Sequence, residues 1–213
     1  MSIAREIASD ILSRVERGAF VSYAQNYEDV ILWRIFKDSP AGCYVDVGAA
    51  HPTKNSVTKA FYERNWRGIN IDPILGHIEL LRAQRPLDIN LQCAVGSTAG
   101  TVEFAVPDRL TQSGDLRIVG PRLQKVSHSF DRLVVPILPL SEILTLQGLS
   151  TAELLKIDVE GSERDVLESI DWDKIRFDVV VVESTVPGTP LDCSDQWRGI
   201  LINAGFEFFI LMD

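Results

Sequence analysis

The chain has 213 residues, enough for one complete α/β domain and too few for two independent cores. Its content of 46% apolar and 24% charged residues is typical of globular proteins and disfavours disordered, fibrous and membrane classes. With 30 acidic residues against 21 Lys and Arg, the net charge is -9, which disfavours nucleic-acid binding because that needs a basic surface.

The N-terminal segment predicts two helices. Apolar residues recur every four positions from Ile3 to Val15, and Gly18 supplies a stop; a second helix covers 28–36. The first helix packs either on the domain's own core or on a partner. Acidic residues interrupt the apolar stretch that an export signal needs, and no run approaches about 18 apolar residues, so we expect no membrane span and a cytoplasmic location.

Beyond residue 38, short apolar runs alternate with helical patterns, which is typical of βαβ units. The pattern predicts an α/β fold with a mostly parallel, doubly wound sheet and helices on both faces. We expect a single domain over 1–213, with 1–37 as a lid and 38–213 as the core. The predicted strands are 43–49, 68–72, 89–95, 154–159, 178–184 and 206–212, and the predicted helices are 54–65, 75–84, 141–146, 162–169 and 194–203.

The alternation breaks between residues 96 and 140. Two extended runs flank a polar stretch there, which predicts a β-hairpin or flap inserted after the third strand. A second irregularity is the apolar strand 206–212, which runs to the end of the chain. Because an exposed edge of this kind is adhesive, we expect either that the chain was cut here or that a second copy or another partner covers the strand.

The loop YVDVGAAHP (44–52) is the first candidate binding element. A dinucleotide site favours three glycines in G-x-G-x-x-G spacing, whereas this loop supplies only Gly48, preceded by Asp46. Asp72 ends the next strand, where a carboxylate can accept hydrogen bonds from a ribose. Acids in place of a phosphate cradle favour the cationic S-adenosylmethionine over NAD. The alternative is that Gly48 forms a turn and Asp46 a cap.

The stretch LLKIDVEGSE (154–163) is the second candidate binding element. Alternation along a strand predicts that Lys156, Asp158 and Glu160 point to one face, just before a helix. Charges on a buried strand are costly unless they are paired or functional. We therefore expect either a cluster facing the substrate or an ion pair of Lys156 with one acid.

Together with SYAQNYEDVIL, RGINIDP, LQCAVGS and VVVVES, these motifs resemble the FkbM family of S-adenosylmethionine-dependent methyltransferases, from about residue 22 to 212. The resemblance implies a Rossmann-like class I methyltransferase fold, whose final antiparallel strand is missing here, and transfer to a hydroxyl of a sugar, glycan or natural product. It also implies a set of donor-binding residues: Gln25, Glu28, Asp29, Asp46, Gly48, Ala49, Asp72, Pro73, Cys93, Ala94 and Asp158.

Methyl transfer to oxygen requires removal of the hydroxyl proton. The candidate bases are Asp158, Glu160 and His51, the last of which is held extended before a proline. Asp158 and Glu160 alone are a weak magnesium site and the cysteines show no zinc pattern, so we expect no metal. The competing functions are a nicotinamide-dependent oxidoreductase and a non-catalytic Rossmann-like binding module.

Overall fold

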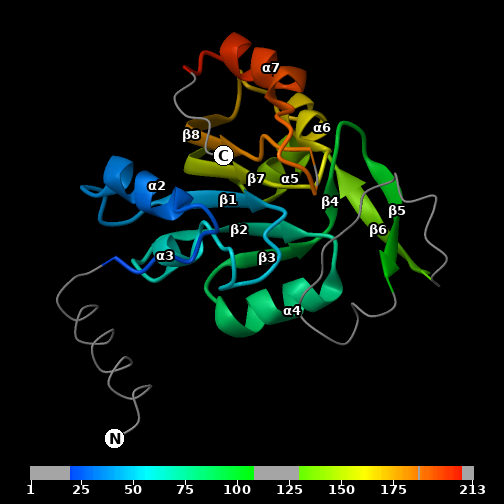
Figure 1. Ribbon diagram of the computed structural model, residues 1–213, viewed down its shortest axis with the longest axis horizontal. Coiled ribbons are helices and arrows are strands. Elements are labelled where there is room, and N and C mark those ends of the chain that lie inside the picture. The colour runs from blue at the N-terminus through cyan, green and yellow to red at the C-terminus, as the bar shows by residue number, and fades with distance from the viewer. Residues whose placement is uncertain (1–19, 108–129, 187, 208–213) are drawn as a thin grey trace, which may run out of the picture.

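A computed structural model describes residues 20–107, 130–186 and 188–207 of the chain (Figure 1). The side chains of 104–107 and 130–132 are not included in this description. The predicted first helix, the middle of the insert and most of the predicted strand 206–212 lie outside the described residues.

Among the described residues, five parallel strands form the main sheet, which confirms the predicted mostly parallel sheet. Their order is β3-β2-β1-β7-β8, so the chain builds outward from β1 in one direction and then returns to add β7 on its other side. In such a sheet, ligands bind at the carboxyl ends of the strands where the order reverses, which here is between β1 and β7. The strands are β1 Cys43–Val47, β2 Arg67–Asp72, β3 Ile89–Gln92, β7 Thr151–Ile157 and β8 Arg176–Val182.

Helices cover both faces of this sheet, because the side chains of each strand alternate between two buried layers. Val45 and Ile71 face α5, α6 and α7 in one apolar core, whereas Tyr44 and Leu154 face α2 and α3 in the other. In Figure 1, α4 lies below the sheet and α7 at the top. The helices are α2 Glu28–Phe36, α3 Lys59–Tyr62, α4 Leu75–Gln84, α5 Leu140–Leu146, α6 Glu163–Glu168 and α7 Arg198–Asn203, with a 3-10 turn η2 at Ser194–Gln196.

The predicted insert forms a second, three-stranded sheet, to the right of the main sheet in Figure 1. β5 Gly100–Pro107 and β6 Phe130–Leu138 pair antiparallel, which confirms the hairpin, and β4 Ala94–Val95 pairs parallel with β6. The predicted single strand 89–95 was wrong in extent: its first part is β3, and its last two residues leave for the second sheet.

Three helix predictions were also wrong in detail. The helix 54–65 shrinks to α3, because Asn55 and Asn65 adopt left-handed backbone conformations with φ of 54° and 66° that a helix cannot contain. The helix 194–203 is divided between η2 and α7. The predicted helix 141–146 begins one residue earlier, because α5 starts at Leu140, and the Ser141 hydroxyl accepts a hydrogen bond from the Asp171 amide. None of the helices among the described residues has the length and apolarity to cross a membrane.

Candidate functional site

The strand-order reversal brings Asp46 of β1 beside Lys156 of β7. The two residues are register partners, and Lys156 Nζ lies 3.3 Å from Asp46 Oδ1. The same ammonium group donates to the carbonyl oxygen of Gly48 at 2.8 Å and lies 3.4 Å from Asp158 Oδ2. One lysine therefore ties together the ends of both strands and the loop that follows β1.

Asp46, Lys156 and Asp158 form an ion-pair group whose members differ in exposure to solvent. Asp46 and Lys156 are almost fully buried, whereas 43% of the Asp158 side chain is exposed. Burial opposes the charge on Lys156, but the carboxylates of Asp46 and Asp158 outweigh it and raise the pKa of the lysine. Burial likewise opposes the charge on Asp158, but Lys156 lowers the pKa of that carboxyl group. The predicted ion pair of Lys156 is confirmed, and a role of Asp158 toward a ligand stays a prediction.

Glu183 completes this group, and the sequence interpretation missed it. It follows the last residue of β8, and its amide donates to Ile157 O at 2.9 Å, so it lies beside the end of β7. Its carboxyl group is hydrogen-bonded to that of Asp158. Burial, followed by the charge of Asp158, raises the pKa of Glu183 to about 8. The only signal in the sequence was an acid directly after the apolar run of a predicted strand.

The loop after β7 departs from strand alternation. β7 ends at Ile157, and Glu160 adopts φ of 56°, so the expectation that Glu160 continues the face of Lys156 and Asp158 does not hold. Glu163, the last acid of the motif, is buried and accepts hydrogen bonds from the amides of Val159 at 3.2 Å and Gly161 at 3.0 Å. Glu163 therefore fixes the shape of this loop. No group of three or more metal-binding side chains with suitable geometry occurs among the described residues.

The loop after β1 is closed by its own hydrogen bonds. The amides of Gly48 and Ala49 both donate to Ile71 O, at 2.9 and 3.2 Å, and the amide of Ala50 donates to Asp72 at 2.9 Å. A pyrophosphate cradle needs such amides to be available. Gly48 is required by close packing, since a Cβ there would collide with the carbonyl oxygen of Asp158. The Cβ position of Gly48 is thus filled by the chain itself, and contact of Gly48 and Ala49 with a methyl donor stays a prediction.

Asp72, the predicted ribose-binding acid, lies in this second layer. Its Oδ2 accepts from the Ala50 amide, and its Oδ1 accepts from the Ile74 amide at 2.8 Å and lies 2.9 Å from His77 Nδ1. Each carboxylate oxygen has two acceptor sites, so Oδ2 retains one for a further donor. The side chain is 2% exposed. Ribose binding by Asp72 stays a prediction.

His51, the third candidate base, has its Nδ1 engaged. That atom accepts hydrogen bonds from the amides of Thr53 and Lys54, both at 3.0 Å. An imidazole accepts a proton through its unprotonated nitrogen, and here that nitrogen shapes a turn. The geometry favours a structural role for His51, and its catalytic role stays a prediction.

Beneath the ion-pair group, a chain of buried polar contacts crosses the sheet. Thr58 Oγ1 donates to Asp46 Oδ2 at 2.6 Å and accepts from the Arg85 guanidinium at 2.9 Å. The fully buried Arg85 also donates to Asp88 at 3.0 Å and to the Tyr44 hydroxyl at 2.7 Å. A buried arginine is costly unless it is paired, and Asp88 pairs it. The orientation of Asp46 is therefore fixed from both sides.

The remaining residues that were predicted to bind the methyl donor lie in two parts of the structure. In the N-terminal element, Gln25 is exposed, Glu28 accepts from the Asn26 amide, and buried Asp29 accepts from Ser22 Oγ at 2.7 Å and the Tyr23 amide at 2.6 Å. These contacts order the loop before α2. Their role toward a donor stays a prediction.

Cys93 lies between β3 and β4, Ala94 is the first residue of β4, and both are buried; Pro73 follows β2. Burial raises the pKa of the Cys93 thiol to about 11, so it stays neutral and packs as a small apolar group. This side chain offers a bound adenine an apolar contact and no charge. The predicted contact with adenine is untested.

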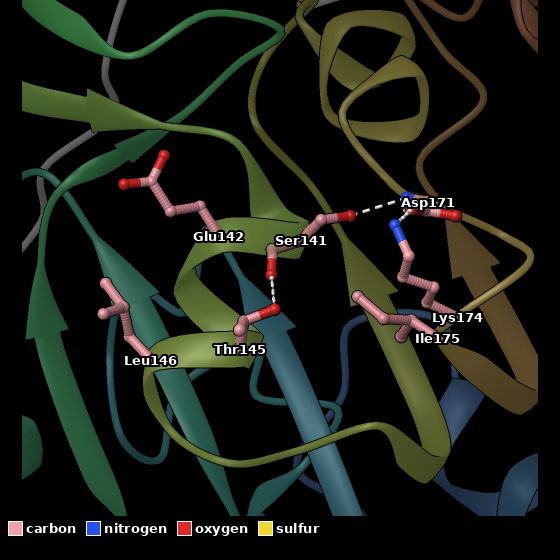
Figure 2. A pocket seen from close by; sticks show the side chains of 7 residues that line it. All are labelled: Ser141, Glu142, Thr145, Leu146, Asp171, Lys174 and Ile175. Atoms are coloured by element: carbon pink, nitrogen blue, oxygen red, sulfur yellow. Dashed lines mark hydrogen bonds and ion pairs between the residues drawn. The ribbon is translucent and has the colours of Figure 1, made fainter.

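A separate hollow of about 260 Å³ lies between α5 and the segment that leads into β8 (Figure 2). Ser141, Thr145 and Leu146 line one side, and Asp171, Lys174 and Ile175 the other. Figure 2 shows the Lys174 side chain directed toward Asp171, in an exposed ion pair. None of its lining residues belongs to the ion-pair group, so this hollow is not the site built by β1, β7 and β8.

The parallel sheet covered on both faces, with a cluster of charged groups at the strand-order reversal, defines a Rossmann-like α/β protein of the kind that methyltransferases use. Residues 46–208 match the family model described as the methyltransferase FkbM domain, and the chain therefore belongs to this methyltransferase family. The predicted resemblance is thus confirmed. No curated protein and no solved structure shows significant similarity to the chain.

Proposed function

We propose that the protein is an S-adenosylmethionine-dependent O-methyltransferase whose acceptor is a hydroxyl group of a sugar, glycan or natural product. The observation that carries this proposal is the acidic character of the strand-order reversal, where Asp46 and Asp158 flank one lysine and Glu183 lies alongside. When bound, S-adenosylmethionine supplies a methyl group on a positively charged sulfur.

The charge and hydrogen-bonding of the site fit that donor better than a dinucleotide. Glu160 and Glu163 add negative charge beside Asp158 and Glu183, which suits a cationic ligand. The amides of Gly48, Ala49 and Ala50 all have acceptors within the chain, so this loop lacks the available donors that a pyrophosphate requires. This arrangement supports the methyltransferase over the oxidoreductase considered above.

The chain's own residues have two tasks in such a reaction. Asp72 would accept ribose hydroxyls through the remaining acceptor site of Oδ2, while its other contacts hold it at the start of α4. The acids at the ends of β7 and β8 would orient the acceptor hydroxyl and take its proton. Asp46 and Lys156, which are buried, would hold the geometry of the site.

Calorimetric titration of S-adenosylhomocysteine and of NAD tests the proposal. We expect a heat of binding with S-adenosylhomocysteine alone. Binding of NAD alone would favour the oxidoreductase. If neither ligand binds, the non-catalytic module is favoured. A screen of glycans and small polyols with labelled S-adenosylmethionine would then identify the acceptor.

Asp72→Ala tests the placement of the ribose. Loss of hydrogen bonds to a charged acceptor should weaken binding of S-adenosylhomocysteine about tenfold or more. His77→Ala is the control, because it removes a partner of Asp72 but keeps the carboxylate. Unchanged affinity in folded Asp72→Ala would contradict the placement.

A further inference from the structure

We propose that Glu183 is the catalytic base of the methyl transfer reaction, and that Asp158 positions it by sharing a proton with it. This inference rests on the function proposed above. It assigns the proton transfer to a residue of the VVVVES stretch for which the sequence predicted no role.

The geometry places both carboxyl groups at the open edge of the sheet. Asp158 and Glu183 each lie one residue beyond the ends of adjacent parallel strands, which pair at Ile157 and Val182. The backbone fixes both positions, because the amide of Asp158 donates to Val47 O at 3.0 Å and that of Glu183 to Ile157 O at 2.9 Å. Asp158 is half exposed and Glu183 is partly exposed at this edge, so the hydroxyl group of a substrate can reach the two carboxyl groups, although Oε2 of Glu183 is itself buried.

Lys156 makes the two acids unequal. Its ammonium group lies 3.4 Å from Asp158 Oδ2, which stabilises the ionised form of Asp158. Two carboxyl groups that are hydrogen-bonded to each other need one proton between them, and Glu183 is the one that keeps it. Thr185 Oγ1 donates to Glu183 Oε1 at 3.3 Å, whereas Oε2 is buried and no N–H or O–H group of the described residues donates to it. A buried oxygen without a donor disfavours the ionised form of Glu183.

The charges around Glu183 all act in one direction. Asp158 and Glu160 approach it from the end of β7, and Glu163 from the start of α6; the lysine is directed at Asp158. Asp192 and Cys193 lie on the segment whose amide donates to Ser184 O. Burial, followed by the charges of Asp158, Glu160 and Glu163, raises the pKa of Glu183 to about 8. A base of this strength is matched to proton transfer near neutral pH, unlike Asp158, whose pKa is lowered.

In the proposed step, removal of the hydroxyl proton accompanies transfer of the methyl group. The O–H bond of the acceptor breaks as its oxygen bonds to the methyl carbon and the bond from that carbon to sulfur breaks, and the proton passes to the partly exposed carboxyl group of Glu183. The thioether leaves with the sulfur electron pair. Glu183 then loses the proton to water, which restores the carboxylate. Catalysis therefore requires the deprotonated form of Glu183 and should increase with pH up to about 8.

The first test follows the carboxyl carbons of 13C-labelled glutamate by NMR in the ligand-free protein. We expect one resonance that titrates near pH 8, is absent in Glu183→Gln, and titrates at lower pH in Asp158→Asn, because the negative neighbour is gone. If no glutamate titrates above about pH 6.5, the carboxyl pair does not share a proton and the proposal is overturned. This measurement does not depend on any ligand.

The second test compares Glu183→Gln with Glu168→Gln, an exposed residue of α6 paired with Arg164. We expect Glu183→Gln to bind S-adenosylhomocysteine like the wild type but to lose about 100- to 10,000-fold in kcat with the acceptor from the glycan and polyol screen, while Glu168→Gln keeps full activity. Asp158→Asn should move the rising limb of the pH profile toward acid. Wild-type kcat in a Glu183→Gln variant that binds S-adenosylhomocysteine overturns the base assignment alone; failure of the wild type to bind it overturns the proposed function as well.

Discussion

Lys156 Nζ lies 3.3 Å from Asp46 Oδ1 in the one place where the strand order of the sheet reverses, and both side chains are almost completely buried. The pair has a structural consequence, because the same ammonium group holds the carbonyl of Gly48 and the carboxylate of Asp158. Stability and the geometry of the proposed donor site therefore depend on one cation.

Lys156→Met should destabilise the protein strongly. The substitution keeps most of the side-chain volume but leaves the carboxylate of Asp46 buried without its counter-ion, which typically costs about 3–5 kcal/mol. Denaturant unfolding measures the loss. Lys174→Met is the matched control, since Lys174 forms an exposed ion pair with Asp171 and its removal should leave the unfolding midpoint unchanged. Equal midpoints for the two variants would show that the buried pair is not formed.

Gly48→Ala should destabilise the protein much more than the addition of one methyl group usually does. Gly48 has φ of 77°, and a Cβ would meet the backbone oxygen of Asp158, a residue whose backbone is held by the hydrogen bond from its amide to Val47 O. We expect poor folding, or a folded variant with lost affinity for S-adenosylhomocysteine. Gly76→Ala, in α4 and with open space around its Cβ position, should be neutral or slightly stabilising by up to about 1 kcal/mol. Thermal unfolding of both variants separates steric collision from a general effect of alanine.

Thr58 links Asp46 to Arg85, and its hydroxyl can be tested separately from its volume. Thr58→Val keeps the shape but removes the 2.6 Å hydrogen bond to Asp46 and the 2.9 Å bond from Arg85, which should cost about 1–3 kcal/mol of unfolding free energy. Thr58→Ser restores the hydroxyl and should recover most of it. If both variants unfold alike, the hydroxyl is not what supports Asp46.

The sequence predicted the layers of this fold well, because they follow from periodicity. The bounds of α2 and α4 agree with the predicted 28–36 and 75–84, and the buried strands β1 and β7 were recognisable as apolar runs. Periodicity could not show that residues 94–95 leave the main sheet, since both of the possible strands are apolar. Asn55 and Asn65, whose left-handed conformations confine α3, are tolerated in helices by sequence criteria.

The site was predictable in its acids but not in their pairing. Strand alternation placed Lys156 with Asp158, yet its closest strand partner, Asp46, lies 110 positions earlier in the chain and is brought there by the strand order. The contact of Arg85 with Thr58 likewise joins distant segments. In the sequence, Glu183 is only the acid at the end of an apolar strand. The pairing of β8 with β7 is what brings it beside Asp158.

The pH dependence of stability offers a final test of the carboxyl pair that requires no ligand. The pKa of Glu183 is raised from its ordinary value of 4.5 to about 8 in the folded protein, so the folded state binds a proton that the unfolded state has lost. The free energy of unfolding that this group contributes is therefore fully present below about pH 4.5 and is lost as the pH rises through about 8. Asp158 acts in the opposite direction, but only at more acid pH, because its pKa is lowered from 3.8.

Denaturant unfolding between about pH 5 and 8.5 should accordingly show the wild type losing stability relative to Glu183→Gln as the pH rises, because the amide cannot ionise. Glu168→Gln should follow the wild type at every pH, since Glu168 lies in an exposed pair on α6. Parallel curves for the wild type and Glu183→Gln would mean that Glu183 ionises alike in the folded and unfolded chain, and the close approach of its carboxyl group to Asp158 would then be wrong.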